Sequence, residues 1–201
     1  LSKEDYFDIV NYCKERKITF LCTPWDTPSV DFLEQLDTPA YKIASGDMTN
    51  FPLIKYISKR KKPMIISTGM SKIEEIEKMV DFVKMLNVQF VLLHANSTYP
   101  SPIESLNVSL IPEYAKKFGL LIGFSDHEIG IIGSLTAANI GAVVIERHIT
   151  LDKKMKGLDH SSSLEPNEFK ELVTMIRSSE KAIGKPIKKM TRAEVLQREV
   201  V

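Results

Sequence analysis

Short apolar runs alternate along the whole chain with stretches of helical periodicity. Six runs rich in β-branched and aliphatic residues recur at intervals. They are Ile18–Cys22, Ala40–Ala44, Pro63–Ser67, Gln89–His94, Leu120–Phe124 and Ala142–Glu146. Their nearly continuous hydrophobicity is typical of strands that are buried on both faces of a parallel sheet. The pattern therefore predicts six strands in a sheet that helices cover.

The stretches between these runs carry apolar residues at helical spacing. In the clearest case, residues 73–83 form one apolar stripe with charged residues on the opposite face, and Ser71 is the expected N-cap. The last helix is predicted to open at Pro166 and to stop at Gly184. Because strands and helices alternate strictly, we expect a parallel sheet with right-handed crossovers.

Two architectures share this alternation: an open doubly wound sheet and a (β/α)8 barrel. A dinucleotide-binding sheet would carry G-x-G-x-x-G after an early strand, and the chain has no such run. We therefore predict an α/β fold of the (β/α)8 TIM-barrel type. The chain begins on a helix without Met, and six strand–helix units are fewer than a closed barrel needs. We expect an incomplete barrel with six of eight units.

Composition and charge exclude several classes of protein. The chain has 201 residues, of which 43% are hydrophobic and 26% charged, as in a soluble globular domain. The net charge of +1 argues against a nucleic-acid partner, and no apolar run approaches the ~20 residues of a membrane span. Cys13 and Cys22 are too few for a disulfide framework, and the start has no signal-peptide pattern. We expect a cytoplasmic protein.

Small hydroxyl residues lie at the ends of four successive predicted strands. These are Ser45, Ser67, Ser97 and Ser125. Each alone is ordinary turn chemistry, but in barrels the carboxyl ends of the strands share one rim, so together they predict an anion site. Lys42, between the apolar Tyr41 and Ile43, would add a positive charge there. The alternative is a lysine that extends to the surface.

Two histidines end adjacent predicted strands. His127 and His148 are one strand–helix unit apart, so both should rise on the same rim. Two imidazoles on one rim suit a divalent metal with open positions, and Asp126 and Glu146 are the acids expected to orient them. We interpret the remaining two histidines differently: His94 as structural and His160 as a loop residue, neither of them a metal ligand.

Five motifs appear in order along the chain. They are residues 41–47 (YKIASGD), 66–70 (ISTGM), 97–100 (STYP), 123–127 (GFSDH) and 145–148 (IERH). Together they resemble the sialic acid synthase family, which includes N-acetylneuraminate synthase and its legionaminate, pseudaminate and spore-coat-polysaccharide relatives. The resemblance runs from Cys22 to Asp159, which is nearly the whole chain.

The resemblance implies a transferase of sialic acid or polysaccharide biosynthesis. Such an enzyme condenses phosphoenolpyruvate with an N-acetylated hexosamine, either N-acetylmannosamine or a diacetamido analogue, to a nine-carbon 2-keto sugar acid and phosphate. It implies that phosphoenolpyruvate binds to Lys42, Ser45, Ser67, Ser97 and Ser125, that a divalent metal binds to His127 and His148, and that Asp47, Tyr99 and Asp159 face the sugar. The metal is expected to be manganese, with magnesium or cobalt as alternatives.

The same resemblance implies catalytic roles for Lys42, Asp47 and Glu146. At position 47 the family member compared first has Glu, one methylene longer than the Asp here. We expect residues 1–184 to form the catalytic barrel domain without its first two units, and residues 185–201 to be a linker toward an absent antifreeze-like domain. In the family that domain lends an arginine to the neighbouring subunit, so the full-length protein is expected to be a domain-swapped homodimer.

Other functions compete with this interpretation. A Schiff-base aldolase could use Lys42 as its nucleophile, because a buried lysine can have a lowered pKa. A metal-dependent aldolase, or a related barrel that condenses phosphoenolpyruvate with a phosphorylated aldose, would share the rim. The second phosphate would need further basic residues, and Arg147 is the only obvious arginine there. A sugar-binding barrel without catalysis is the non-enzyme alternative.

Overall fold

The computed structural model describes residues 1–200 and contains one parallel sheet with helices around it. The strands are β1 (Tyr41–Ile43), β2 (Met64–Ser67), β3 (Phe90–Ala95), β4 (Ile122–Asp126) and β5 (Ile145–Arg147). The α-helices are α1 (Lys3–Glu15), α2 (Thr27–Gln35), α3 (Phe51–Ser58), α4 (Ile73–Met85), α5 (Leu110–Phe118), α6 (Ile132–Asn139), α7 (Pro166–Ile183) and α8 (Arg192–Val200). Short 3₁₀ turns are η1 (Ser45–Asp47), η2 (Ile103–Ser105) and η3 (His160–Ser162).

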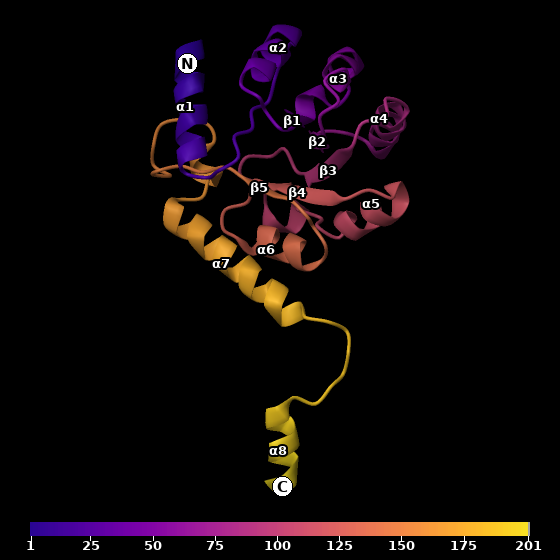
Figure 1. Cartoon of the computed structure of the whole chain (residues 1–201), viewed down its shortest axis with the longest axis vertical. Helices are drawn as coiled ribbons and strands as arrows, with labels where there is room; N and C mark the ends of the chain where they lie inside the picture. The colour runs from indigo at the N-terminus through magenta and orange to yellow at the C-terminus, as the bar shows by residue number, and fades with distance from the viewer. Residues whose placement is uncertain (201) are drawn as a thin grey trace.

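The sheet is a curled half-barrel. Its strands are all parallel and lie in sequence order, β1-β2-β3-β4-β5. Figure 1 shows α2 to α6 fanned around one side of the curved sheet, with α1 and α7 toward its open side. The helices α3, α4, α5 and α6 each connect the end of one strand to the start of the next, as the predicted alternation requires. The α/β class and the parallel order are confirmed.

The predicted count of six strands is not confirmed. The run Ile18–Cys22 is not a strand, because no ladder of backbone hydrogen bonds joins it to β1 within the described residues. Ile18 is 63% exposed, so this run also lacks the burial that its composition suggested. A β-branched run has only a preference for extended backbone, whereas a strand needs a hydrogen-bonded partner. The other five runs are strands, and β4 and β5 end one or two residues later than expected.

The core lies between the outer face of the sheet and the helices. Tyr41 and Ile43 of β1 are fully buried there, whereas Lys42 between them points to the inner face. The apolar stripe of α4 is confirmed, because Ile76 and Val80 are both 1% exposed. This alternation along each strand turns polar side chains toward the inside of the half-barrel.

Three helix ends were predicted, two of them correctly. The helix that begins at Pro166 does end before Gly184. Ser71, however, is not the cap of α4. The helix begins one residue later, with Lys72 as N-cap and its backbone N–H donating to Oε2 of Glu75 at 2.7 Å. The hydroxyl of Ser71 instead donates to the Gly69 carbonyl, because the preceding turn brings that oxygen within 3.2 Å.

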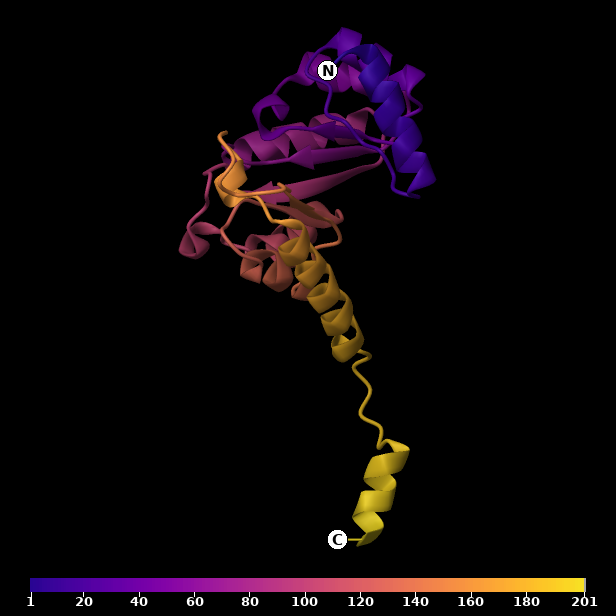
Figure 2. The same ribbon diagram turned by 90° about the vertical axis from the view of Figure 1, so that its left-hand side faces the viewer.

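The C-terminal segment stands apart from the half-barrel. Residues 184–191 form no regular element, and α8 is exposed along its whole length. Figures 1 and 2 both show α8 at the end of an extended segment that leads away from α7. Among residues 1–200 no helix is both long and apolar enough to span a membrane. Cys13 and Cys22 are free thiols.

Candidate functional site

A polar cavity of about 550 Å³ lies at the carboxyl ends of the strands. It is lined by Thr23, Trp25, Lys42, Ala44, Ser45, Gly46, Ser67, Met70, Ser97, Tyr99, Ser125, His127, Glu146, Arg147 and His148. All five strands or the loops that follow them contribute to this lining. The structure therefore brings the predicted hydroxyls, lysine and two histidines together at one rim.

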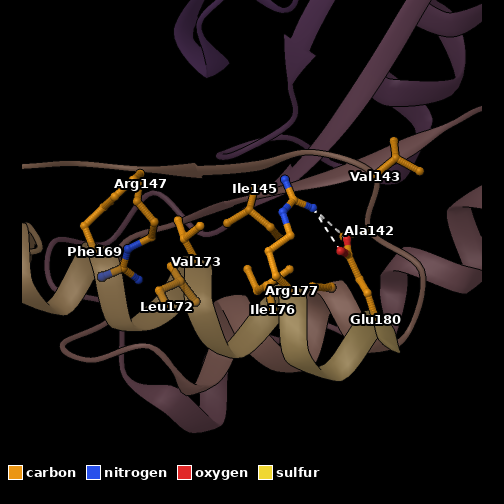
Figure 3. A pocket seen from close by; sticks show the side chains of 11 residues that line it. Ala142, Val143, Ile145, Arg147, Phe169, Leu172, Val173, Ile176, Arg177 and Glu180 are labelled. Carbon is orange, nitrogen blue, oxygen red and sulfur yellow. Dashed lines mark hydrogen bonds and ion pairs between the residues drawn. The ribbon is translucent and has the colours of Figure 1, made fainter. Parts of the chain in front are cut away.

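A second cavity, of about 220 Å³, lies between α7 and β5 (Figure 3). Apolar side chains such as Leu172, Val173 and Ile176 form most of its wall. Its charged groups Arg177 and Glu180 already pair with each other at 2.9 Å. Arg147, the third charged residue of this lining, pairs with Asp126. Because each charged group here already has a partner, the larger cavity is the better candidate for the chemistry.

Lys42 lies at the centre of a hydrogen-bond network in the polar cavity. Its Nζ donates to Oγ of Ser67 at 2.8 Å and lies 3.3 Å from Oε2 of Glu146. The other carboxylate oxygen of Glu146 accepts from the Ser125 hydroxyl at 2.7 Å. Burial lowers the pKa of the Lys42 ammonium, and the Glu146 carboxylate opposes that change. The alternative of a lysine that extends to the surface is wrong.

The remaining two serines meet at Gly69, in the loop after β2. The Gly69 backbone N–H donates to Oγ of Ser45 at 3.0 Å. A Cβ at position 69 would lie 2.1 Å from Oγ of Ser97 and 2.9 Å from Oγ of Ser45. Two hydroxyls and a backbone N–H can approach each other this closely only because residue 69 has no side chain.

The two histidines lie side by side on the opposite wall. The ring centroids of His127 and His148 are 5.2 Å apart, and the Tyr99 ring lies 4.1 Å from the first and 5.6 Å from the second. Nδ1 of His127 is 2.7 Å from the carbonyl oxygen of Asn96. That bond fixes Nδ1 as the donor, which leaves Nε2 with a free lone pair.

The charge state of His127 suits a metal ligand. Burial lowers the pKa of its imidazole, so the neutral form that binds metals is favoured at neutral pH. The described residues contain no group of three or more His, Cys, Asp or Glu side chains placed for one metal. The two imidazoles therefore fit a site that would take its other ligands from water or substrate.

The acids expected to orient these imidazoles do not do so. Asp126 lies on the other face of β4, where its carboxylate is 2.6 Å from Nη1 of Arg147. Glu146 is engaged by Lys42 and Ser125 instead of by His148. The Asp126 expectation is wrong because adjacent residues of a strand point to opposite faces. The Glu146 expectation is wrong because that carboxylate, although it shares a face with His148, bonds to Lys42 and Ser125. A backbone carbonyl, that of Asn96, orients His127.

Asp47 and Asp159 lie outside the lining of the cavity. The Asp47 carboxylate accepts from the side-chain amide of Asn50 at 2.9 Å, within the turn that leads into α3. Oδ2 of Asp159 is 3.7 Å from Nδ1 of His148, and its side chain is 55% exposed. Burial raises the pKa of the Tyr99 phenol, and the negative charges of Asp159 and Glu146 add to that increase.

The other two histidines behave as expected. Nε2 of the buried His94 bonds to the Leu106 carbonyl at 2.8 Å, and Nδ1 of His160 bonds to the Thr150 hydroxyl at 2.7 Å in the loop region after β5. Trp25 lines the cavity although the sequence assigned it no role. Its position directly after an apolar run is the signal that could have identified it.

A cavity lined by titratable side chains at the carboxyl ends of a parallel half-barrel places the chain in the β/α-barrel class of proteins. The chain belongs to the NeuB family, whose family model matches residues 1–188. The predicted resemblance is confirmed.

Curated relatives agree with this family. The chain is 42% identical over 195 residues to human N-acetylneuraminate-9-phosphate synthase, an alignment that covers 96% of this chain and 54% of that protein. It is 43% identical over 192 residues to N,N'-diacetyllegionaminic acid synthase of Campylobacter jejuni, covering 93% of this chain and 57% of that one. The chain thus spans about half the length of the curated relatives it matches.

Solved structures show the same fold. The sialic acid synthetase of Leptospira borgpetersenii, solved with citrate, superposes with a TM-score of 0.91 at 32% identity, over all of this chain and 70% of that one. Phospho-2-dehydro-3-deoxyheptonate aldolase of Thermotoga maritima superposes with a TM-score of 0.78 over 94% of this chain and 58% of that one. Its 17% identity speaks for the fold alone.

Proposed function

We propose that the protein condenses phosphoenolpyruvate with an N-acetylated hexosamine, N-acetylmannosamine or a diacetamido analogue, to give a nine-carbon 2-keto sugar acid and phosphate. Its relatives are named synthases of sialic and legionaminic acids. The observation that carries the proposal is the network in which Lys42, Ser67, Ser125 and Glu146 open into the same cavity as His127 and His148. That cavity has one wall suited to an anion and one suited to a metal.

The anion wall would bind phosphoenolpyruvate. Lys42 supplies the positive charge, and the hydroxyls of Ser45, Ser67, Ser97 and Ser125 supply hydrogen-bond donors around it. Hydroxyls and backbone N–H groups at the ends of barrel strands are a common phosphate site. Lys42 now bonds to Ser67, Ser45 to the Gly69 N–H and Ser125 to Glu146. An anion would exchange these internal hydrogen bonds for bonds to its own oxygens.

A divalent metal would bind to the other wall, through His127 and His148. We propose manganese, with magnesium or cobalt as alternatives. The free Nε2 and the lowered pKa of His127 support this assignment. Such an ion supplies Lewis-acid polarisation of the sugar aldehyde oxygen when it is bound. Tyr99, which lies against both rings, would contact the sugar, and Asp47 and Asp159 are assigned to its outer end.

The reaction sets clear demands on the side chains. The enol carbon of phosphoenolpyruvate bonds to the aldehyde carbon, water adds to C2 of the pyruvyl group, and the C–O bond to phosphate breaks. The added water must lose a proton, and the Glu146 carboxylate in the cavity wall would accept it. Lys42 would hold the anionic end throughout and stabilise the charge on the departing phosphate.

The wider organisation is also proposed from the family. In the natural protein, residues 1–184 would belong to a complete (β/α)8 barrel, and residues 185–201 would link it to the antifreeze-like domain of a domain-swapped homodimer. The superposition on the Leptospira sialic acid synthetase over the whole of this chain supports the barrel. A cytoplasmic location is supported by the two free cysteines, which a reducing compartment maintains.

The proposal is tested by phosphate release from phosphoenolpyruvate. The natural-length protein is supplied with Mn²⁺ and, in separate reactions, N-acetylmannosamine, its 6-phosphate or a diacetamido hexose. We expect phosphate and a 2-keto sugar acid, identified by mass spectrometry, with one of these sugars. Borohydride in the presence of pyruvate should leave Lys42 unmodified. Trapping of an imine at Lys42, with no phosphate release, would establish the Schiff-base aldolase instead.

A further inference from the structure

A buried ion pair lies behind the two histidines, on the far face of their strands. Ser125 of β4 is paired in register with Glu146 of β5, and Asp126 with Arg147. Because successive side chains of a strand point to opposite faces, Ser125 and Glu146 meet in the cavity and the next pair meets behind it. There Nη1 of Arg147 lies 2.6 Å from Oδ2 of Asp126, and these side chains are 1% and 0% exposed.

Each member of this pair also binds the segments that follow the strands. The Asp126 carboxylate accepts from the Glu128 backbone N–H at 3.0 Å and from the Ser134 hydroxyl of α6 at 2.5 Å. Nη2 of Arg147 donates to the Glu128 carbonyl at 2.8 Å and lies 3.4 Å from the Ser162 carbonyl of η3. The pair therefore joins both strand ends, the loop after β4, α6 and η3.

The position of the histidines relative to this pair is the central observation. His127 lies between Asp126 and Glu128, which are both bound to Arg147, and His148 is the residue directly after Arg147. The backbone of each histidine is thus fixed on at least one side by a group of the pair. The next step of the same register sets the two histidines opposite each other, which agrees with their ring separation of 5.2 Å.

Stability alone is a weak reason for such a pair. The free energy needed to remove two charges from water is about as large as the free energy gained from their attraction. Apolar residues of similar size can therefore often replace a buried ion pair without loss of stability. Nε of Arg147 is buried without a hydrogen-bond partner in the described chain, which adds to that cost. Figure 3 shows the Arg147 side chain extending beside Phe169 of α7, among apolar neighbours.

We propose that the Asp126–Arg147 ion pair is a positioning device that holds His127 and His148 side by side for a divalent metal. Neither residue ligates the metal; they act through the backbone of the residues that do. The proposal rests on the proposed function for the metal itself, whereas the alignment of the two rings is a property of the protein without metal.

The decisive variant removes both charges together. Asp126→Asn with Arg147→Met removes both charges of the pair together, and Asn can still accept from the Glu128 N–H, so the fold should persist. Lys153→Met with Glu168→Gln is the matched control, because that ion pair, 2.5 Å long, lies away from the cavity. Arg147→Lys keeps one charge contact but loses the forked reach to the Glu128 and Ser162 carbonyls.

Three measurements on the natural-length protein are compared across these variants. The electron paramagnetic resonance signal of free Mn²⁺ gives the Mn²⁺ affinity, and thermal unfolding reports whether the variant folds. The position of the His127 ring is followed in metal-free, ¹⁵N-histidine-labelled protein, through the NMR signal of the ring N–H that bonds to Asn96. We expect the double variant to unfold like the wild type but to bind Mn²⁺ about 10- to 100-fold more weakly, the usual cost of losing a group that supports a ligand. Its His127 ring signal should broaden or move, Arg147→Lys should recover part of both losses, and the control pair should change neither.

The outcomes separate the two proposals. A double variant that folds, binds Mn²⁺ like the wild type and keeps the His127 ring signal overturns the positioning role. If the wild type binds no Mn²⁺, or if His127→Ala binds it equally well, the metal assignment fails and the ring signal alone decides the positioning role. If the double variant does not fold, the Arg147→Lys variant tests the positioning role instead. The proposal is overturned if Arg147→Lys binds Mn²⁺ as tightly as the wild type and its His127 ring signal is unchanged.

Discussion

The two walls of the polar cavity are organised in opposite ways. On the β1–β2 side, Lys42 bonds to Ser67 and Glu146, and the Ser45 hydroxyl accepts from the Gly69 N–H. On the β4–β5 side, His127 is held from outside, by the Asn96 carbonyl on its far nitrogen, and no described residue bonds to its Nε2. A ligand on the first wall must therefore replace existing bonds, whereas a ligand on the second finds an atom already free.

Removing the charge of the first wall should have the largest effect. In Lys42→Ala the anion loses its only lysine in the cavity lining, and Glu146 is left without its partner. We expect kcat/KM for phosphoenolpyruvate to fall by about 10²–10³-fold, a loss typical of one key electrostatic contact. Phosphate release measures it, with the exposed Lys55→Ala as control. A protein that folds and turns over normally would show that Lys42 is structural.

Breaking the second wall should change metal binding more than substrate binding. His127→Ala removes the imidazole whose free nitrogen faces the cavity, so Mn²⁺ affinity should fall by about 100-fold or more. Thermal unfolding should change little by comparison. His160→Ala is the matched control, since that histidine lies outside the cavity lining and bonds to Thr150. Equal Mn²⁺ affinity in both variants would refute the difference between the walls.

A pH profile tests the link between the walls, because Glu146 touches Lys42. The carboxylate raises the pKa of Lys42 against the lowering effect of burial. Glu146→Gln removes that support, so the pKa of Lys42 should fall further and its charge should be lost at lower pH. We expect the alkaline limb of kcat/KM for phosphoenolpyruvate to move to lower pH than in the wild type. An unmoved alkaline limb would exclude Lys42 as the group that sets it.

The smallest effect is expected outside the cavity, on stability. Glu34 pairs with Lys62 at 2.9 Å and accepts from the Tyr41 hydroxyl at 2.5 Å, and these partners lower its pKa. Because the folded pKa lies below the unfolded value, this stabilisation is present above the unfolded pKa of about 4.3 and is lost as the pH falls through the folded pKa. Glu34→Gln should cost on the order of 1 kcal/mol at neutral pH.

Urea unfolding at neutral and at acid pH measures that cost. The difference between Glu34→Gln and the wild type should shrink at acid pH, while phosphate release stays normal at neutral pH. Glu146→Gln should show the reverse combination, with strongly reduced but measurable activity and nearly unchanged stability. The same loss of activity in both variants would mean that the cavity and the N-terminal end of β1 are not independent.

The hydrophobic pattern predicted which face of the sheet each side chain occupies better than it predicted the number of strands. Five apolar runs became strands because each has a neighbour to bond, and Lys42 and Glu146 faced the cavity as strand alternation requires. Ile18–Cys22 has the same composition but no partner ladder. A local hydrophobic pattern does not determine whether a segment pairs with a strand that is distant in the sequence.

The orientation of His127 was beyond sequence reasoning for a related reason. Proximity in sequence suggested Asp126 as its partner, yet a strand turns neighbouring side chains to opposite faces. The actual partner, the Asn96 carbonyl, belongs to a backbone atom 31 residues away that every residue type possesses. The type of residue at position 96 therefore gives no indication that its carbonyl oxygen bonds to His127. Asp47 likewise followed a strand, but the 3₁₀ turn η1 carried its carboxylate toward Asn50 and out of the cavity lining.

Gly69 has a consequence for anyone who mutates this protein systematically. It binds nothing through a side chain, yet the space that a methyl group would need is already filled by the Ser97 and Ser45 hydroxyls. Gly69→Ala would drive those oxygens away from the loop without deleting either of them. In a mutational scan, position 69 should therefore score as intolerant as the charged residues of the cavity, although no contact map of a bound substrate would single it out.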